Sequence, residues 1–184
     1  MDWQRTEPTK ITKVGWRTIV AKTFTLPDGK SVEFDTINRE DFSAAGIIAL
    51  TKDNKVITGR QFRPGPEQLM DEIPGGIVDP GESPETAAKR EMLEETGYEA
   101  GSLKFLGAFH RDSMTNGKWY YYLATDCELV STTPENGEHE FIEVILKTIP
   151  KFINDAKKGL ITDPFAVLAA YDDLIALNKE EIKE

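Results

Sequence analysis

Residues 75–98 read GGIVDPGESPETAAKREMLEETGY, and the fold is worked out from this stretch. Ser83 followed by Pro84 is typical of a helix start, and Gly97 is typical of the left-handed residue that ends a helix. The pattern therefore predicts a helix over 84–96. Turns rich in glycine and proline precede this helix, and glycine there lets the backbone approach a ligand closely.

Four glutamates cluster in the same stretch. Glu91, Glu94 and Glu95 fall within one arc of about 100° on the predicted helix, and Glu82 lies in the loop before it. Because like charges on one helix face repel, the arrangement predicts a bound cation of the Mg²⁺ type, which prefers carboxylate oxygens. The alternative is a solvated charged face, although such faces usually interleave Lys with Glu. Arg90 lies off the acidic arc but could reach round to orient a carboxylate.

Composition limits the classes of partner. The 184 residues carry 22 Lys+Arg and 32 Asp+Glu, a net charge of −10, which opposes binding to nucleic acid and admits phosphate chemistry only with metal or local arginine. No apolar run approaches the ~20 residues of a membrane helix, and the start of the chain does not resemble a signal peptide. Cys127 is the only cysteine, so no internal disulfide can form. We expect a cytoplasmic, single-domain protein with a small appendage and no membrane partner.

The remaining elements are expected from alternation and turn signals. They are a hairpin over 14–37, strands at 44–51 and 55–63, a short strand at 69–74, a strand pair around RDSMTNG, a strand in EFIEVILK, and closing helices at 150–158 and 164–179. This order predicts an α/β fold with a mixed sheet between helices. Phe62 is expected in the core.

The acidic stretch also matches a known motif. The pattern G-x5-E-x7-R-E-U-x-E-E-x-G-U is met in full by Gly76, Glu82, Arg90, Glu91, Met92, Glu94, Glu95, Gly97 and Tyr98. The chain thus resembles a Nudix hydrolase. The resemblance implies a Nudix-type sandwich of a mixed β-sheet between α-helices, with an N-terminal β-hairpin extension at residues 1–40 and the hydrolase domain at 41–184. Such enzymes hydrolyse a diphosphate joined to another moiety.

The resemblance implies roles for the motif residues. Glu91 and Glu95 are expected to be the principal Mg²⁺ ligands, with Mn²⁺ as the alternative ion. Glu94 is expected to bind metal or hold a water of the site, and so to take part in catalysis. Glu82 would assist through water, and the carbonyl of Gly75 is a further expected ligand.

Sequences outside the motif resemble the ADP-ribose and ADP-sugar pyrophosphatase branch, namely LPDGK, ALTKDNKVITGRQFRPG and EIPGG. This implies cleavage of a nucleoside diphosphate linked to a sugar, giving NMP and a sugar phosphate, by a homodimer formed through the N-terminal hairpin. The loop HRDSMTNGKW lacks the Ser-Pro-Gly turn usual in the ADP-ribose group, which leaves other nucleoside-diphosphate sugars open. Two alternatives also stay open: a house-cleaning hydrolase of (d)NTPs or other nucleotides, and a non-catalytic nucleotide-sensing module.

Candidate substrate contacts and a candidate base lie outside the motif. Arg60 and Arg63 are candidate substrate contacts, and the planar fork of Arg63 suits a diphosphate, with a surface ion pair as the alternative. Glu72 is a candidate acceptor for a nucleobase amine. Glu140, with Glu138 second, is the candidate catalytic base in the loop PENGEHEF, where solvated loop acids are the alternative.

Overall fold

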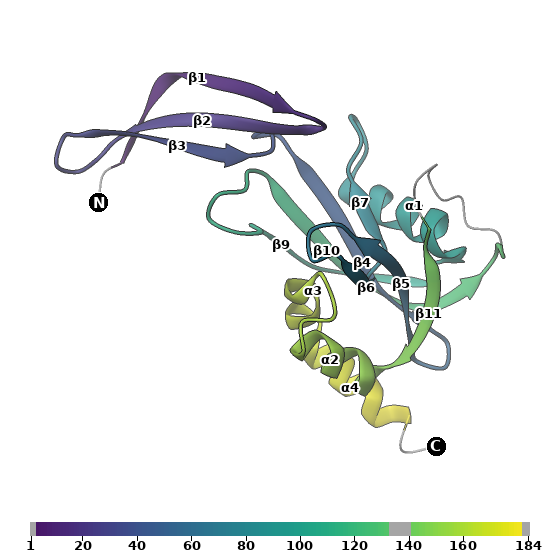
Figure 1. Ribbon diagram of the computed structural model, residues 1–184. Coiled ribbons are helices and arrows are strands. Elements are labelled where there is room, and N and C mark those ends of the chain that lie inside the picture. The colour runs from purple at the N-terminus through teal and green to yellow at the C-terminus, as the bar shows by residue number, and fades with distance from the viewer. Residues whose placement is uncertain (1–2, 133–140, 182–184) are drawn as a thin grey trace. The chain divides into compact units, whose positions relative to one another are not determined.

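The computed structural model describes residues 3–132 and 141–181, and the chain divides into two compact units (Figure 1). The first unit comprises residues 1–43 and 110–119, and the second comprises residues 44–109 and 120–184. The long acidic stretch that matched the motif lies wholly in the second unit.

The first unit is built on a three-stranded antiparallel sheet of β1 (Gln4–Val14), β2 (Arg17–Thr25) and β3 (Ser31–Ile37). β2 and β3 form the expected hairpin, closed by a hydrogen bond of 2.7 Å from Leu26 N to Lys30 O. β1 was not expected, because its sequence QRTEPTKITKV has few apolar residues and contains Pro8, which cannot donate to a sheet. Its register with β2 shifts once across that proline, between Thr6 and Lys10.

An aromatic cluster lies on this sheet. The rings of Trp3, Phe24 and Phe34 have centroids 6.1 to 6.4 Å apart. Trp3 is 46% exposed and Phe34 is 37% exposed, so part of the cluster faces outward. The three-stranded sheet therefore leaves apolar surface uncovered in the described chain.

The second unit is built on an eight-stranded sheet with helices. Its strands are β4 (Ser43–Thr51), β5 (Lys55–Arg63), β6 (Gln68–Glu72), β7 (Gly75–Ile77), β8 (Tyr98–Glu99), β9 (Ser102–Phe109), β10 (Lys118–Leu129) and β11 (Glu143–Thr148). The central path runs β11-β5-β4-β10-β8, while β6 pairs with β5, β7 with β4 and β9 with β10. The helices are α1 (Pro84–Thr96), α2 (Ile149–Lys157), α3 (Pro164–Ala169) and α4 (Tyr171–Glu181). The α/β fold with a mixed sheet is confirmed.

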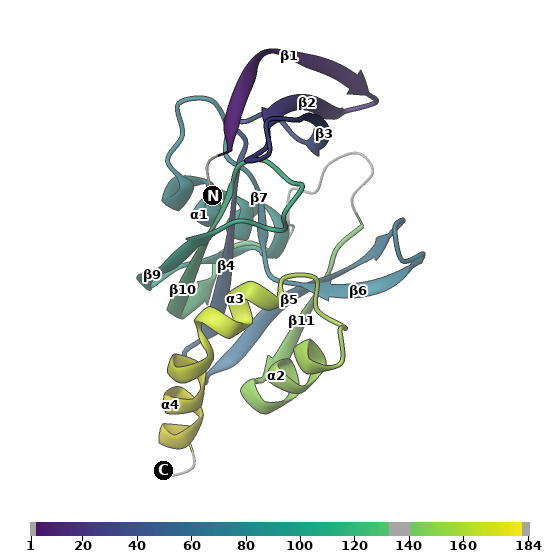
Figure 2. The same cartoon turned by 90° about the vertical axis from the view of Figure 1, so that its left-hand side faces the viewer.

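Both faces of the central strand β4 are covered, which explains its continuous apolar sequence. Every residue from Ala44 to Leu50 is buried. On one face, Ala45 and Ile47 join a core cluster with Ala88 and Met92 of α1. Helices α2, α3 and α4 lie on the other side of the sheet from α1 (Figure 2). The acidic helix is thus anchored through its buried flank.

The closing helices differ from expectation in one respect. The single helix expected over 164–179 is two helices, because α3 ends at Ala169 and α4 begins at Tyr171. No glycine or proline separates them, but Ala170 and Leu174 are fully buried, so packing rather than local sequence places the break. Among the helices of residues 3–132 and 141–181, none has the length and apolar character needed to cross a membrane.

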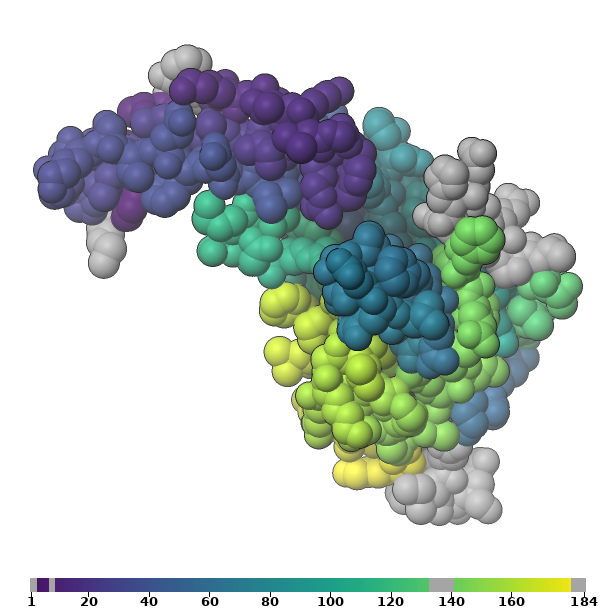
Figure 3. Space-filling view, viewed as in Figure 1, coloured from purple at the N-terminus to yellow at the C-terminus, as the bar shows by residue number. Residues whose placement is uncertain are grey.

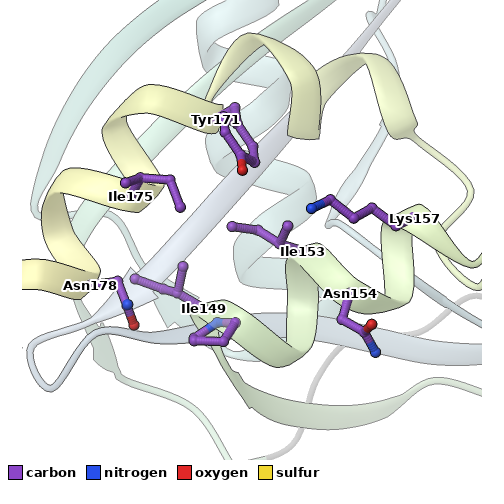
Figure 4. A pocket seen from close by; sticks show the side chains of 8 residues that line it. Ile149, Ile153, Asn154, Lys157, Tyr171, Ile175 and Asn178 are labelled. Carbon is purple, nitrogen blue, oxygen red and sulfur yellow. The ribbon is translucent and has the colours of Figure 1, made fainter.

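A hollow of about 300 Å³ lies between α2 and α4 (Figure 4). Ile149, Ile153 and Ile175 give it an apolar lining. Lys157 and Tyr171 stand together at its side, with the ammonium 5.8 Å from the ring centroid. None of the acidic motif residues lines this hollow.

Strands β4 and β5 form a fork. They are paired at Ala49–Ile57 and Leu50–Val56, and farther along β5 pairs with β6 while β4 pairs with β7. The chain crosses from β6 to β7 through Pro74, whose carbonyl accepts a hydrogen bond of 2.9 Å from Ile47 N. The acidic loop therefore begins at the fork, where Glu72 pairs with Gly59 of β5 and Gly75 pairs with Gly46 of β4.

Candidate active site

The acidic helix α1 forms as its sequence predicts. The hydroxyl of Ser83 accepts a hydrogen bond of 3.1 Å from Thr86 N, which caps the N-terminus. Gly97 has φ of 75° and its N–H donates to Leu93 O at 2.8 Å, which ends the helix. The glutamates are therefore carried on a helix with both ends fixed.

Arg90 holds three of the four glutamates together. Its Nε donates to Glu82 at 3.0 Å, and its Nη1 donates to Glu91 at 2.9 Å and to Glu94 at 3.0 Å. Its Nη2 also donates to the carbonyl of Ile77 at 3.3 Å. The hydrogen bonds with Glu82 raise the pKa of Arg90 and lower the pKa of Glu82. Arg90 thus reaches round to orient the carboxylates.

The fourth glutamate is held by the backbone. Glu95 accepts a hydrogen bond of 3.1 Å from Gly75 N. Beside it, a Cβ on Gly76 would lie 2.2 Å from the Glu91 carboxylate oxygen, so only glycine lets this carboxylate rest against the chain. Gly76, the first residue of the motif, and Gly75 just before it therefore form a cradle for Glu91 and Glu95.

The donor set is that of a site for a hard cation. It consists of carboxylate oxygens and backbone carbonyls, the ligands that Mg²⁺ and Mn²⁺ accept. In the described part of the chain, no three Asp, Glu, His or Cys side chains stand close enough together to hold a metal ion. Instead, the Arg90 guanidinium supplies the positive charge among Glu82, Glu91 and Glu94. Because a carboxylate has two oxygens and about four acceptor positions, these glutamates can contact Arg90 and an ion at the same time.

Arg63 and Glu72 form a pair at the fork. Glu72 accepts from Arg63 Nε at 2.5 Å and from Arg63 Nη2, and Gln61 donates to the same carboxylate at 3.3 Å. The pKa of Arg63 is raised, chiefly by its hydrogen bonds to Glu72 and further by the charges of Glu95 and Asp163. Arg63 therefore lies within the field of the acidic motif, and its guanidinium is held in a two-point geometry.

Arg60 belongs to a different group. Because side chains alternate along a strand, Arg60 points to the opposite face of the sheet from Arg63. The Arg60 Nε donates a hydrogen bond of 2.7 Å to Asp71. Asp71 also accepts from the buried Lys147 at 2.5 Å, and Lys147 donates to Asp155 of α2 at 2.5 Å. Burial alone would raise the pKa of Asp71, but hydrogen bonds from Arg60 and Lys147 lower it below its ordinary value. The structure therefore brings Arg63, but not Arg60, together with the motif.

Comparison with known proteins assigns the family. The family model described as the NUDIX domain matches residues 41–160. The chain belongs to the Nudix family. Residues 76–98 are thus a Nudix box, and members of this family generally use divalent metal ions.

Two relatives and one solved structure are similar to this Nudix protein over most of its length. The chain is 34% identical over 125 residues to an ADP-ribose pyrophosphatase of Bacillus subtilis, covering 67% of this chain and 66% of that protein. It is 29% identical over 145 residues to a methanol dehydrogenase activator of Bacillus methanolicus, covering 78% and 77%. A crystal structure titled as an ADP compounds hydrolase superposes with a TM-score of 0.73, covering 96% and 95% of the two chains at 22% identity. This last likeness shows the Nudix fold.

The remaining predicted site residues have mixed outcomes. Glu138 and Glu140 lie outside the described residues, so their role as base stays a prediction. The metal-ligand roles of the box residues and the substrate roles of Arg60, Arg63 and Glu72 also stay predictions. The expectation that Phe62 is core is wrong, because Phe62 is 57% exposed and pairs with Leu69, which is 65% exposed. The β5–β6 hairpin that carries both residues lies at the surface of the second unit, in the blue region that faces the viewer in Figure 3.

Sequence reasoning missed two groups of polar residues. Lys147 could have been found, because its place in the alternation of β11 puts a charge on the inward face opposite Val56. Asp163, which accepts a hydrogen bond from Tyr121, had no such signal, since Asp-Pro reads simply as a helix start.

Proposed function

We propose that this Nudix protein is a Mg²⁺-dependent pyrophosphohydrolase that cleaves a nucleoside diphosphate linked to a sugar, of the ADP-ribose or ADP-sugar type, into NMP and sugar phosphate. The observation that carries this proposal is the gathering of four glutamates by Arg90 and by the Gly75 N–H on and beside α1. The similarity to an ADP-ribose pyrophosphatase supports the substrate class.

The box residues would hold the ions. Glu91 and Glu95 are the proposed principal ligands, with Glu94, Glu82 and the carbonyl of Gly75 completing the site. When bound, divalent ions neutralise the diphosphate, polarise its phosphorus and lower the pKa of a water. The all-oxygen donor set suits Mg²⁺, and because it suits Mn²⁺ as well, Mn²⁺ stays the alternative ion.

Arg63 is the proposed contact for the diphosphate. Its guanidinium already makes two hydrogen bonds to one carboxylate, Glu72, and a phosphate offers the same two-oxygen geometry. The side chain is 42% exposed, so a substrate can reach it while Glu72 keeps it oriented. Glu72 as an acceptor for a nucleobase, Arg60 as a second contact, and Glu140 or Glu138 as the base complete the proposal.

We also propose a homodimer formed through the N-terminal extension at residues 1–40, next to a hydrolase domain at 41–184, in the cytoplasm. The support is the partly exposed aromatic cluster of Trp3, Phe24 and Phe34, since apolar surface of this kind marks an interaction site.

Metal-dependent turnover tests the proposed function. The protein is incubated with a panel of nucleoside-diphosphate sugars and nucleoside triphosphates, with Mg²⁺ or with EDTA, and the products are separated. We expect NMP and sugar phosphate with Mg²⁺ only. Release of pyrophosphate from triphosphates would instead favour the house-cleaning alternative, and tight ADP-ribose binding without products would favour a sensing module.

Two variants test the ligands. Glu91→Gln and Glu95→Gln are expected to lower kcat by about 100-fold or more, because each removes one charged ligand. Glu85→Gln is the matched control, since Glu85 lies on the same helix but pairs with Lys89 at 2.6 Å. Full activity in Glu91→Gln or Glu95→Gln would refute the ligand assignment.

A further inference from the structure

Asp163 occupies the N-cap position of α3 but does not cap it. An aspartate there ordinarily accepts a hydrogen bond from one of the first helical N–H groups. The Asp163 side chain makes no such bond. Instead, its Oδ1 accepts from the hydroxyl of Tyr121 at 3.0 Å and its Oδ2 accepts from the hydroxyl of Thr162 at 2.9 Å. The carboxylate is therefore turned away from its own helix and fixed elsewhere.

The segment that carries Asp163 runs beside β6. Ile161 forms a parallel bridge with Asp71, and Asp71 N donates to Leu160 O at 3.3 Å. The residue after Asp71 is Glu72, the partner of Arg63. Because the two segments run parallel, the residues after Ile161 lie beside the residues after Asp71. Asp163 therefore lies beyond Glu72, at the fork between β4 and β5.

Tyr121 connects Asp163 to the Nudix box. A Cβ on Gly46 would lie 3.2 Å from the Tyr121 ring and 3.1 Å from the side chain of Ile73, so both pack over Gly46. Gly46 is the register partner of Gly75, whose N–H holds Glu95. A continuous set of contacts thus leads from Asp163 to the box.

Electrostatics agree with this placement. The hydrogen bonds to Glu72 are the largest cause of the raised pKa of Arg63, and the charges of Glu95 and Asp163 raise this pKa further. A box glutamate and Asp163 therefore act on the same guanidinium, the one proposed to contact the diphosphate.

The chemistry of the carboxylate limits what it can bind. An ionised carboxylate only accepts hydrogen bonds and offers about four lone-pair sites. In the described chain, each Asp163 oxygen accepts one hydrogen bond, which leaves further acceptor capacity on both. A ligand at this place must bring donors, which the oxygens of an ionised diphosphate lack. The neighbouring hydroxyls of a sugar supply two donors side by side.

We propose that Asp163, held in place by Tyr121 and Thr162, binds the hydroxyl groups of a substrate sugar and makes the protein prefer hydroxylated over deoxygenated sugars. This inference rests on the proposed function for its substrate class. It assigns a substrate-binding role to a residue outside the Nudix box.

The test measures binding without turnover. The α,β-methylene analogue of ADP-ribose is titrated by calorimetry in Mg²⁺ against the wild type and Asp163→Asn, together with analogues that lack hydroxyls on one or the other ribose. We expect the wild type to bind the full analogue about 10-fold or more tightly than one of the deoxy analogues. Asp163→Asn should lose most of that preference, and the analogue concerned identifies the ribose.

Two further variants serve as a second test of the carboxylate and as a control. Tyr121→Phe removes the hydroxyl that fixes the carboxylate and should reduce the same preference. Asp173→Asn is the matched control, because Asp173 on α4 pairs with Lys104 at 2.7 Å and should bind like the wild type. Since Asp163 makes no cap hydrogen bond, Asp163→Asn should unfold at nearly the wild-type temperature.

The outcomes separate the two proposals. If the wild type binds and hydrolyses nucleoside-diphosphate sugars but Asp163→Asn keeps the full preference for hydroxylated sugars, the role of Asp163 is refuted and the proposed function stands. If the wild type binds none of the analogues, both are refuted.

Discussion

Arg90 donates hydrogen bonds to three carboxylates that would otherwise repel one another. The geometry makes Arg90 an internal counter-ion, and any divalent ion must share or take over that role. At the scale of single residues, the site therefore has one positive charge in the described chain, that of Arg90, facing four carboxylates, and it stays negative before a substrate arrives.

We expect Arg90→Gln to lower stability in EDTA at neutral pH and to change its pH dependence. The pKa of Glu82 lies below its ordinary 4.5 in the folded protein because of Arg90. A carboxyl group whose pKa is lower in the folded than in the unfolded protein stabilises the folded state at pH values above the unfolded pKa. This stabilisation is lost as the pH falls through the pKa of the folded state. The wild type should thus lose this stability on acidification below about pH 4.5, the ordinary value.

Without Arg90, acidification should relieve repulsion among the remaining carboxylates, so Arg90→Gln should lose less stability than the wild type between neutral and acid pH. Urea unfolding at several pH values in EDTA measures this. Lys89→Gln, which removes an exposed pair with Glu85, is the control. Parallel pH profiles for Arg90→Gln and the wild type would contradict the prediction.

The glycine that ends α1 gives a second prediction at this scale. Gly97 has φ of 75°, and a Cβ there would lie 2.0 Å from the carbonyl oxygen of Ser131. Gly97→Ala should therefore cost more than about 2 kcal/mol, since backbone strain and a clash with backbone add. Gly81→Ala, at φ of 87° but in open space, should cost only about 1 kcal/mol. Equal losses in urea unfolding would show that the clash is absent.

At the scale of elements, a buried set of charges joins β5, β6, β11 and α2. Lys147 lies between Asp71 and Asp155, and all three side chains are less than 10% exposed. Arg60 and Lys151 extend the set at its two ends. This arrangement fixes β6, which also carries Glu72, to α2, the helix that contains Asp155.

Lys147→Met should lower the free energy of unfolding by about 3 kcal/mol, because it leaves two buried carboxylates without their shared cation. Lys151→Met is the matched control and should cost less than about 1 kcal/mol, since Lys151 is 59% exposed. Chemical denaturation of both variants measures the difference. Similar small losses would mean that Arg60 and Lys151 suffice to compensate the carboxylates.

At the scale of the whole molecule, the prediction concerns assembly. Sedimentation should give about twice the chain mass of 20.6 kDa, and replacing Trp3 and Phe34 together by Ser should give the monomer. The control replaces Phe62 and Leu69, an exposed apolar pair of the second unit, and should leave the mass unchanged. A wild type that sediments as a monomer would refute the homodimer.

By itself, the sequence determined the Nudix box and its helix, because these depend on local rules. Ser83, Pro84 and Gly97 specify the helix ends, and the glutamate spacing places the acids on one face. Strands β4 and β5 were equally predictable, since buried runs and turns are local signals.

Only the tertiary structure decided which distant polar groups meet. The pairing of Arg63 with Glu72, the ion pairs of Lys147 with Asp71 and Asp155, and the turning of Asp163 toward Tyr121 depend on which strands and helices pack together. The same holds for β1, which is a strand through pairing with β2, and for the break at Ala170. These features arise from the pairing and packing of different strands and helices, which a local sequence pattern does not specify.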